Sequence, residues 1–459
     1  MTLIDATDSR PVHFMGIGGA GMSALAELLR RRGVTVTGCD VVPDGAADVA
    51  RQGIAVAMGH DPGHMDGVRA VVVTSAVPRD HPELLRAGQL GIPVIRRAEA
   101  LGEAVGGATL IAVAGTHGKT TTTVMATEAL AAAGLSPTGL AGGRVPDWHG
   151  NLRAGDDTVF VVEADEYDRS FLALTPTIAA VTNVERDHLD IYTDLADIRG
   201  AFEQFLAPAR AVVVCADDAG ASALTIPSGA EVLSYGITTA SARLSANDIM
   251  SVEGRLRFLV RLDGSELGEL AVRVPGMHNV RNALAALGCG LAMGTSLEAM
   301  RRGLEAFEGV ERRFQRLGAV RGVQVVDDYA HHPTEITATL DAARAAFPGR
   351  RLIAAFQPHL FTRTRDFADA FGVALARADL VFLTEIYPAR EQPLPGVTSA
   401  LVVDALRKAG RSPEWVGERS TLADALAQVA REGDVVLTLG AGDITNTGRE
   451  LLHRLGTGS

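Results

Sequence analysis

Short hydrophobic runs alternate with longer amphipathic segments from the start of the chain. Four runs in the first hundred residues are short enough to be buried strands, and they lie at 12–15, 34–38, 70–74 and 93–95. Between the first two, residues 22–32 repeat apolar side chains at helical spacing. Because strands that alternate with helices are typical of βαβ units, we predict a parallel sheet covered by helices.

The same alternation resumes twice further along. After small residues at 102–108, a second set of strands lies at 109–114, 159–162, 178–182, 211–215 and 270–274, with helices at 280–292 and 297–307. A third set of strands lies at 323–326, 352–356, 380–384 and 435–439. A chain of 459 residues also exceeds a single ordinary core. We therefore predict an α/β protein of three domains, at 1–106, 107–313 and 314–459.

Composition narrows the class of protein. The net charge of −12 argues against nucleic acid or a membrane surface as partner, because these polyanions attract clustered Lys and Arg. No apolar stretch approaches the roughly 20 residues that span a bilayer, and residues 1–10 lack the features of a signal peptide. We expect a cytoplasmic protein without membrane insertion, acting on small molecules as a monomer or weak homodimer. Cys39, Cys215 and Cys289 lie far apart in apolar surroundings, and we interpret them as buried core thiols.

The strongest chemical signal is a glycine turn between the strand at 109–114 and a helix that runs to about Ala133. Its residues are Gly115, Thr116, His117, Gly118, Lys119, Thr120 and Thr121. Backbone N–H groups of such a turn and the helix N-terminus bind phosphates, the Lys reaches the β- and γ-phosphates, and the Thr120 hydroxyl can ligate Mg²⁺. The chain has only one other lysine, Lys408. The loop is shorter than the usual pattern at its first glycine, yet its context predicts a nucleotide-binding site.

Acidic residues follow two of the predicted strands of the central domain. Glu163 comes directly after the strand at 159–162, and His188 follows the strand at 178–182 within a segment rich in acidic residues. Oxygen ligands with a supporting imidazole suit a hard cation, so we predict that Glu163 and His188 hold the metal together with Thr120. Solvated loop charges remain an equal interpretation for Asp168, Glu185 and Asp190.

The N-terminal glycines have two interpretations. Gly16, Gly18 and Gly21 follow the first strand, and Asp40 closes the second, which together satisfy the fingerprint of a dinucleotide-binding site. Alone, this pattern is typical of an NAD-dependent oxidoreductase. The same turn can also cradle the diphosphate of another nucleotide ligand, and we favour this interpretation because a simple dehydrogenase needs no ATP loop. A non-catalytic nucleotide switch or motor is a third possibility, but it would not need the paired histidines His331 and His332.

Motifs in all three thirds of the chain, in the same order, resemble those of the Mur ligase family of peptidoglycan synthesis. They are Gly16 to Met22, Gly115 to Thr121, Glu163 to Glu166, Asp187-His188, His278-Asn279 with Asn282, Arg312 to Phe314, Asp327 to Pro333, and Gln357 to His359. The resemblance implies a Rossmann-like N-terminal domain for a UDP-sugar, a central P-loop ATPase-type domain with a parallel sheet for ATP, and a Rossmann-like C-terminal domain for an amino acid.

The resemblance also implies roles for individual residues. Phosphates of ATP would bind to the loop from Gly115 to Thr121, and adenine would lie near Asn279 and Asn282. The catalytic residues would be Lys119, His188, Arg313, Asp328 and His331. Those for the UDP-sugar would be Gly16, Gly18, Gly19, Gly21, Asp40 and Ser75, and those for the amino acid Tyr329, His331, His359 and Arg363.

Within the family, the Gly-Thr-His form of the loop and the run from His331 to Glu335 look most like the branch that adds L-alanine to UDP-N-acetylmuramate. That activity consumes ATP with Mg²⁺ through an acyl phosphate and serves cell-wall synthesis and cell division. The ligase that recycles murein tripeptide and the folate polyglutamate ligases are nearer rivals than a dehydrogenase. Two departures stand out: Leu360 occupies a position where arginine is usual, and no lysine between Lys119 and Lys408 could carry a modified metal ligand.

Overall fold

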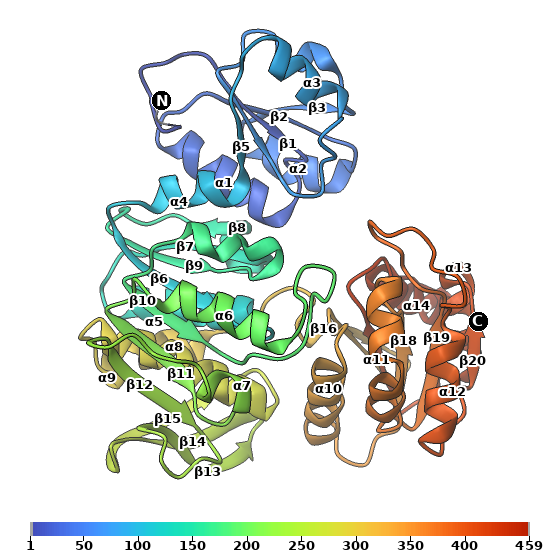
Figure 1. The fold of residues 1–459 in the computed structure, drawn as a ribbon. Coiled ribbons are helices and arrows are strands. Elements are labelled where there is room, and N and C mark those ends of the chain that lie inside the picture. The colour runs from blue at the N-terminus through green and yellow to red at the C-terminus, as the bar shows by residue number, and fades with distance from the viewer. Residues whose placement is uncertain (1–2, 458–459) are drawn as a thin grey trace.

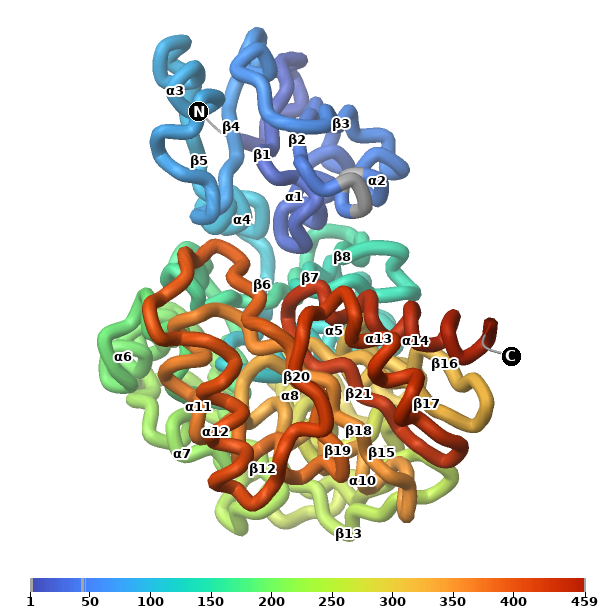
Figure 2. The backbone as a smooth tube through the Cα atoms, turned by 90° about the vertical axis from the view of Figure 1, so that its right-hand side faces the viewer, coloured from blue at the N-terminus to red at the C-terminus, as the bar shows by residue number. Residues whose placement is uncertain are grey.

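The computed structural model describes residues 3–457, and they form three α/β domains, each built around its own sheet. The N-terminal domain sits at one end of the central domain, and the C-terminal domain lies against a side of it (Figure 1). In the perpendicular view the C-terminal domain lies in front of the central one (Figure 2). The prediction of a three-domain α/β fold is confirmed, whereas the exact domain boundaries stay a prediction.

The N-terminal sheet is parallel throughout, in the order β3-β2-β1-β4-β5. Its elements are β1 (Val12–Met15), α1 (Ala20–Arg31), β2 (Val36–Asp40), α2 (Pro43–Arg51), β3 (Ala55–Met58), η1 (Pro62–Met65), β4 (Ala70–Val73), α3 (Pro82–Gln89), β5 (Val94–Arg96) and α4 (Arg97–Val105). Side chains of β1 alternate between the two faces, so Val12 and Phe14 join the core beneath α1 while Met15 joins a smaller core on the opposite face.

The central domain has a ten-stranded sheet in the order β15-β14-β13-β12-β11-β10-β6-β9-β7-β8. Its first elements are β6 (Thr109–Ala114), α5 (Lys119–Ala132), β7 (Thr138–Val145), η2 (Pro146–Trp148), β8 (Gly150–Arg153), β9 (Val159–Glu163), η3 (Tyr167–Ala173), β10 (Ile178–Val181) and α6 (Leu195–Leu206). They are followed by β11 (Ala211–Cys215), α7 (Ala219–Ser222), β12 (Glu231–Gly236), β13 (Leu244–Val252), β14 (Arg255–Leu262), β15 (Ser265–Val272), α8 (Met277–Ala292) and α9 (Leu297–Ala306).

The C-terminal sheet has the order β16-β17-β21-β18-β19-β20, and only its β16–β17 pair is antiparallel. The elements are β16 (Gln315–Val320), β17 (Val323–Asp328), α10 (Pro333–Ala346), β18 (Leu352–Phe356), α11 (Phe361–Leu375), β19 (Leu380–Thr384), α12 (Ala400–Lys408), β20 (Trp415–Gly417), α13 (Arg419–Val429), β21 (Val435–Leu439) and α14 (Thr445–Thr457). Two cores, one on each face of this sheet, contain its buried strand residues.

The central sheet departs from the predicted parallel arrangement at both edges. From β13 to β7 neighbouring strands run parallel, but β13, β14 and β15 form an antiparallel meander and β7 pairs antiparallel with β8. Residues 244–262 carry many charged and exposed side chains. These strands therefore lack a clear hydrophobic pattern, and sequence analysis did not predict the meander. It predicted a single strand at 270–274, where the structure has β15.

Packing between domains brings the predicted motifs together. Helix α1 packs on β7 and β8, and α4 packs on η3, so the N-terminal domain shares a continuous hydrophobic core with the central domain. The glycine turn before α1 therefore faces the same region as the phosphate loop before α5. Within residues 3–457, no helix combines the length and the apolar character needed to cross a bilayer.

Candidate functional site

The phosphate loop connects β6 to α5 and needs glycine at two positions. Gly115 and Gly118 have φ values of +136° and +81°, in the region that favours glycine. A Cβ on Gly115 would lie 2.0 Å from the Thr182 hydroxyl, and a Cβ on Gly118 would lie 2.6 Å from the Asn282 carbonyl oxygen. The loop is therefore packed against the end of β10 and against α8 as well as being conformationally restricted.

Asn183, the second residue after β10, holds the phosphate loop by hydrogen bonds to His117. Its side-chain Oδ1 accepts the backbone N–H of His117 at 2.7 Å, and its Nδ2 donates to the His117 carbonyl at 3.0 Å. The Thr182 hydroxyl donates to the same carbonyl. Sequence analysis assigned Asn183 no role, because only the fold shows that it contacts the loop.

Lys119 is the first residue of α5, and its ammonium group points back into the loop. Nζ donates to the Gly115 carbonyl at 2.7 Å and forms an ion pair of 2.8 Å with Glu166. Burial would lower the pKa of Lys119, but Glu166 and the nearby acidic residues raise it above its usual value. Lys119 is thus held as a cation at the phosphate loop, and Glu166 is a site residue that sequence analysis did not single out.

Glu163 ends β9 next to the loop, as predicted. Its carboxylate accepts the Thr120 hydroxyl at 3.0 Å and the backbone N–H of Gly142 at 2.6 Å. Burial raises its pKa. His188 lies near Glu166, with Nε2 3.6 Å from the carboxylate. Burial would lower the pKa of His188, but Asp187 and Glu166 raise it above its usual value.

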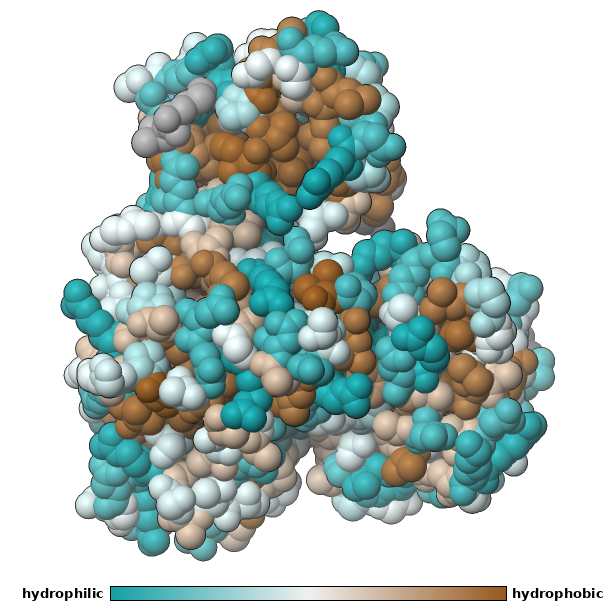
Figure 3. All heavy atoms as spheres, viewed as in Figure 1, coloured by the Kyte–Doolittle hydropathy of each residue, from teal (hydrophilic) through white to brown (hydrophobic). Residues whose placement is uncertain are grey.

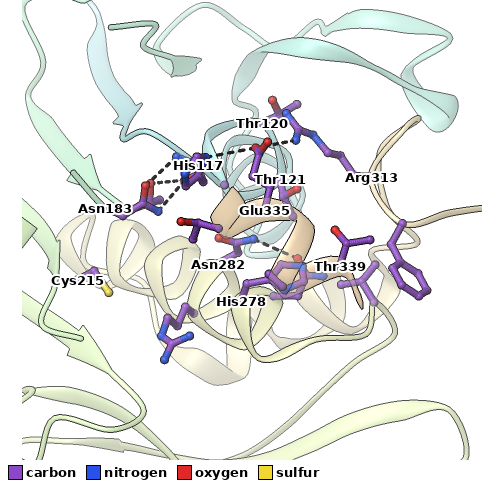
Figure 4. A pocket seen from close by; sticks show the side chains of 18 of the residues that line it. His117, Thr120, Thr121, Asn183, Cys215, His278, Asn282, Arg313, Glu335 and Thr339 are labelled. Carbon is purple, nitrogen blue, oxygen red and sulfur yellow. Dashed lines mark hydrogen bonds and ion pairs between the residues drawn. The ribbon is translucent and has the colours of Figure 1, made fainter. Parts of the chain in front are cut away.

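Two cavities meet at the loop. One, of about 330 Å³, is lined by Thr121, Asn279, Asn282, Arg313 and Asp328 among others, and Figure 4 shows it from close by. The other, of about 670 Å³, lies among all three domains. The residues that line both are His117, Gly118, Thr120, Val310, Arg313 and Glu335. A ligand in one cavity can therefore reach a ligand in the other across Thr120 and Gly118.

The larger cavity receives residues predicted from each third of the chain. They are Gly19 and Gly21 of the N-terminal domain, Thr116 to Thr120, Glu163 and His188 of the central domain, and Arg313, Tyr329, His331, His359 and Arg363. Figure 3 shows hydrophilic side chains, with some hydrophobic ones among them, along the surface where the central and C-terminal domains meet. The structure thus assembles most of the predicted substrate residues, together with the metal candidates Thr120, Glu163 and His188, around one space.

Four predicted N-terminal residues lie outside this lining. Gly16 and Gly18 form the turn itself, and Asp40 accepts hydrogen bonds from the backbone N–H groups of Gly18 at 2.7 Å and Val42 at 2.8 Å. Ser75 is exposed after β4. These backbone bonds hold the Asp40 carboxylate against the glycine turn, at the end of β2.

Glu335 on α10 connects the C-terminal domain to the loop. One carboxylate oxygen lies 3.3 Å from His117 Nδ1, and the other accepts the backbone N–H of His331 at 3.0 Å. Burial would lower the pKa of His117, but Glu335 and Glu185 raise it to about 9. His117 is therefore an imidazolium at neutral pH. The sequence of the loop did not predict this charge, because Glu335 and Glu185 lie far from His117 along the chain.

Arg363 and Asp328 are buried charged residues of the C-terminal domain, and they have different partners. Arg363 forms a 2.6 Å ion pair with Asp187 of the central domain. Asp328 accepts the backbone N–H groups of Phe314 and Ala330, each at 2.8 Å, and burial raises its pKa to about 6. His331 is also buried, and its pKa is lowered.

The sequence was compared with known protein families and with individual relatives. Sequence profiles described as "Mur ligase family, catalytic domain", "Mur ligase middle domain" and "Mur ligase, glutamate ligase domain" match residues 11–109, 113–290 and 312–442. The chain belongs to the Mur ligase family. It is 46% identical to a UDP-N-acetylmuramate–L-alanine ligase of Solibacter usitatus, over 97% of this chain and 95% of the relative. It is 44% identical to a protein of the same name from Streptomyces griseus, over 99% of both chains.

Solved structures of Mur ligases resemble this one along the whole chain. The UDP-N-acetylmuramate–alanine ligase of Thermotoga maritima is 30% identical, with a TM-score of 0.83 over 98% of this chain and all of that one. The murein peptide ligase of Psychrobacter arcticus is 26% identical, with a TM-score of 0.72 over 97% and 99% of the two chains.

Leu360, the departure noted in the sequence, is part of this Mur ligase site. It lines the larger cavity and precedes α11 with a φ of +69°, a conformation that is rare for a branched side chain. Its backbone N–H donates to the Tyr387 carbonyl at 3.0 Å. The side chain is 3% exposed, so it closes the cavity wall with an apolar surface.

Proposed function

We propose that this Mur ligase joins L-alanine to the lactyl carboxylate of UDP-N-acetylmuramate, converting ATP to ADP and phosphate. The relatives from Solibacter usitatus and Streptomyces griseus carry this activity in their names and align over nearly the whole chain. The observation that carries the proposal is the meeting of two cavities at Gly118 and Thr120, because it brings a nucleotide and a second anionic substrate together at one phosphate loop.

The smaller cavity suits the nucleoside of ATP. Its floor is α8, where Asn282 Nδ2 donates to Asn279 Oδ1 at 3.1 Å and Asn279 Nδ2 donates to the Pro275 carbonyl at 2.7 Å. These bonds fix the amide orientations beside the loop. Burial and nearby arginines lower the pKa of His278 to about 4, so this imidazole is neutral and can accept or donate a hydrogen bond at the base or ribose.

The residues around Glu163 fit a magnesium ion. Glu163 offers a buried carboxylate and Thr120 a hydroxyl, the oxygen ligands that Mg²⁺ prefers. His188 Nδ1 is buried and has no hydrogen-bond partner in the part of the chain that the structure describes, which leaves it available to a metal or a metal-bound water. A bound Mg²⁺ would neutralise charge on the β- and γ-phosphates. With no lysine between Lys119 and Lys408, these residues would hold it without a modified lysine.

In the first step a carboxylate oxygen of the muramoyl group attacks the γ-phosphorus, the bond to the β-phosphate oxygen breaks, and ADP leaves. Lys119 and Arg313 would stabilise the negative charge on the transferred phosphoryl group. Both line the larger cavity, and the Arg313 guanidinium lies 3.5 Å from Glu335, which orients it towards the loop.

In the second step the neutral amine of alanine attacks the acyl carbon, phosphate leaves, and the amine loses a proton. His331 is better placed than Asp328 to accept that proton. Its pKa is lowered by burial, so its imidazole is neutral, and it lines the larger cavity. Asp328 lines the smaller cavity and not the larger one, and its carboxylate already accepts two backbone N–H groups. Tyr329, His359 and Arg363 would form the surrounding alanine pocket.

Phosphate release from ATP and Mg²⁺ in the presence of UDP-N-acetylmuramate tests the proposal, with L-alanine, glycine, L-serine or murein tripeptide added in separate reactions. The expected result is release with L-alanine that Lys119→Ala lowers by about 100-fold or more. Release only with tripeptide would assign the protein to the recycling branch, which the Psychrobacter structure represents. No release with any acceptor would overturn the ligase proposal.

A further inference from the structure

A second cluster of metal-ligating side chains lies in the N-terminal domain, outside the site described above. Four of the twelve histidines of the chain surround Glu83 and Cys39, both of which are 0% exposed. These histidines are His13, His60, His64 and His81. The polar atoms of His13, Cys39, His64 and Glu83 all lie within 4.8 Å of one another. Burying polar groups costs free energy unless they form hydrogen bonds or bind a metal. A cluster of imidazole, thiol and carboxylate groups in a small core therefore requires an explanation.

The fold brings the four residues to one point from separate elements. His13 lies on β1, Cys39 on β2, His64 in η1 and Glu83 in the first turn of α3. They lie on the face of the sheet that α3 and η1 cover, where Met15, Met65 and Ala87 form the surrounding apolar core. Helix α1 and the central domain pack on the other face, so this cluster is separate from both cavities of the ligase site.

Two of the distances between the ligand atoms equal the edges of a tetrahedral zinc site. His13 Nε2 lies 3.4 Å from Cys39 Sγ, and Sγ lies 3.5 Å from Glu83 Oε1. Zinc bonds of about 2.0–2.3 Å imply ligand separations of about 3.3–3.6 Å. The contact between His64 Nδ1 and Glu83 Oε1 is shorter, at 2.7 Å, and would open by roughly half an ångström around an ion.

The remaining contacts orient these side chains as metal ligands require. His13 Nδ1 lies 3.0 Å from the Thr37 hydroxyl, a contact that leaves Nε2 facing Cys39. Glu83 accepts the backbone N–H of Asp61 at 3.0 Å. Partners of this kind fix the tautomer of a ligating histidine and the direction of a ligating carboxylate.

We propose that His13, Cys39, His64 and Glu83 bind one Zn²⁺ ion, which fastens α3 and η1 to the N-terminal sheet. Zinc suits this set because it accepts nitrogen, sulfur and oxygen in a closed tetrahedral structural site. A dication, one thiolate and one carboxylate have a total formal charge of zero, which limits the free-energy cost of burial. Binding would convert the Cys39 thiol to a thiolate and release its proton to water.

The other two histidines, His60 and His81, contact the cluster but are not among the four proposed ligands. His60 Nδ1 lies 3.2 Å from Cys39 Sγ and 3.0 Å from Glu83 Oε2. His81 precedes α3, and its ring lies edge-on to that of His60 at 4.8 Å between centroids. Both are nearer the surface than Cys39, so an ion would reach the buried ligands past them.

Cobalt titration of the chelator-treated full-length protein tests the site directly. Co²⁺ in a tetrahedral site with a thiolate gives intense visible and near-ultraviolet absorption, which Zn²⁺ then removes by displacement. We expect saturation near one Co²⁺ per chain. Cys39→Ser should abolish the thiolate absorption, whereas Cys289→Ser, which alters another buried free thiol, should retain it. Phosphate release by each variant serves as the check on folding.

His64→Asn provides a second variant that keeps the thiol. Its side chain is partly exposed, so its replacement disturbs the core less, and affinity should fall by more than about 100-fold, since even outer partners of metal ligands contribute about 10–100-fold. His149→Asn, in the loop after η2, is the matched control and should bind as the unmodified protein does. A protein that shows no saturable absorption, or a Cys39→Ser variant that still shows it, would overturn the proposal without affecting the ligase assignment.

Discussion

Asp187 of the central domain and Arg363 of the C-terminal domain form an ion pair of 2.6 Å whose side chains are only 7% and 5% exposed. Burial would raise the pKa of Asp187, but Arg363 and the neighbouring histidines hold it well below its usual range. Because both residues line the larger cavity, this pair joins the domains at the proposed alanine pocket.

Asp187→Asn should leave the Arg363 guanidinium buried without its counter-charge. Removing one partner of a buried pair costs about 3–5 kcal/mol, so the contact between the central and C-terminal domains should weaken and kcat/KM for L-alanine should fall at least about tenfold. Steady-state kinetics and small-angle scattering measure the two effects. Asp190→Asn is the matched control, because Asp190 pairs with Arg390 across the same boundary at 3.4 Å but near the surface. Equal effects of the two substitutions would contradict the prediction.

Lys119→Ala should reduce kcat by about 100-fold to 1000-fold, the range for removing one preorganised charge that stabilises a transition state. The other lysine of the chain provides a stringent control. Lys408 is 74% exposed and forms an ion pair with the exposed Asp369, so Lys408→Ala should leave the rate unchanged. Single-turnover phosphoryl transfer is the appropriate measurement, and a normal rate for Lys119→Ala would remove this residue from the mechanism.

Gly118→Ala should abolish ATP binding. The new Cβ would lie 2.6 Å from Asn282 Oδ1 and would also require a positive φ. Gly134→Ala is the control for the positive φ, because Gly134 has a φ of +88°. A Cβ there would have no atom of the described residues within 4 Å. The control should therefore lose about 1–2 kcal/mol of stability and keep its nucleotide affinity by calorimetry. Unchanged affinity in Gly118→Ala would show that α8 yields to the methyl group.

Glu163→Gln should raise the Mg²⁺ concentration needed for half-maximal activity, because it replaces a charged oxygen ligand by a neutral one. The amide would still accept the Thr120 hydroxyl, so the local structure should persist. Glu231→Gln, at the exposed start of β12, is the control. Activity measured at several Mg²⁺ concentrations distinguishes a weakened metal site, which excess Mg²⁺ rescues, from a general loss of function, which it does not.

The sequence predicted those features that depend on local pattern. The strand before Gly115 and the helix after Lys119 follow from hydrophobic periodicity and glycine chemistry, and Glu163 follows from its place at the end of a strand. Glu166 and Asp187 were not assigned site roles, because their importance depends on partners 47 and 176 residues away. The His13 and Cys39 cluster was missed for the same reason: its members are unremarkable until four elements converge.

Stability should depend on pH through His117, whose imidazolium lies between Glu335 and Glu185. Its folded-state pKa of about 9 exceeds the ordinary 6.5. A raised pKa contributes stability that is full below pH 6.5 and is lost as pH rises through about 9. Each pKa unit corresponds to about 1.4 kcal/mol, so the contribution should be on the order of 3 kcal/mol. Chemical denaturation across this window should show a stability difference between the unmodified protein and His117→Gln that shrinks with rising pH. The exposed His453→Gln should show no such convergence, and a difference independent of pH would mean that His117 is neutral in the folded protein.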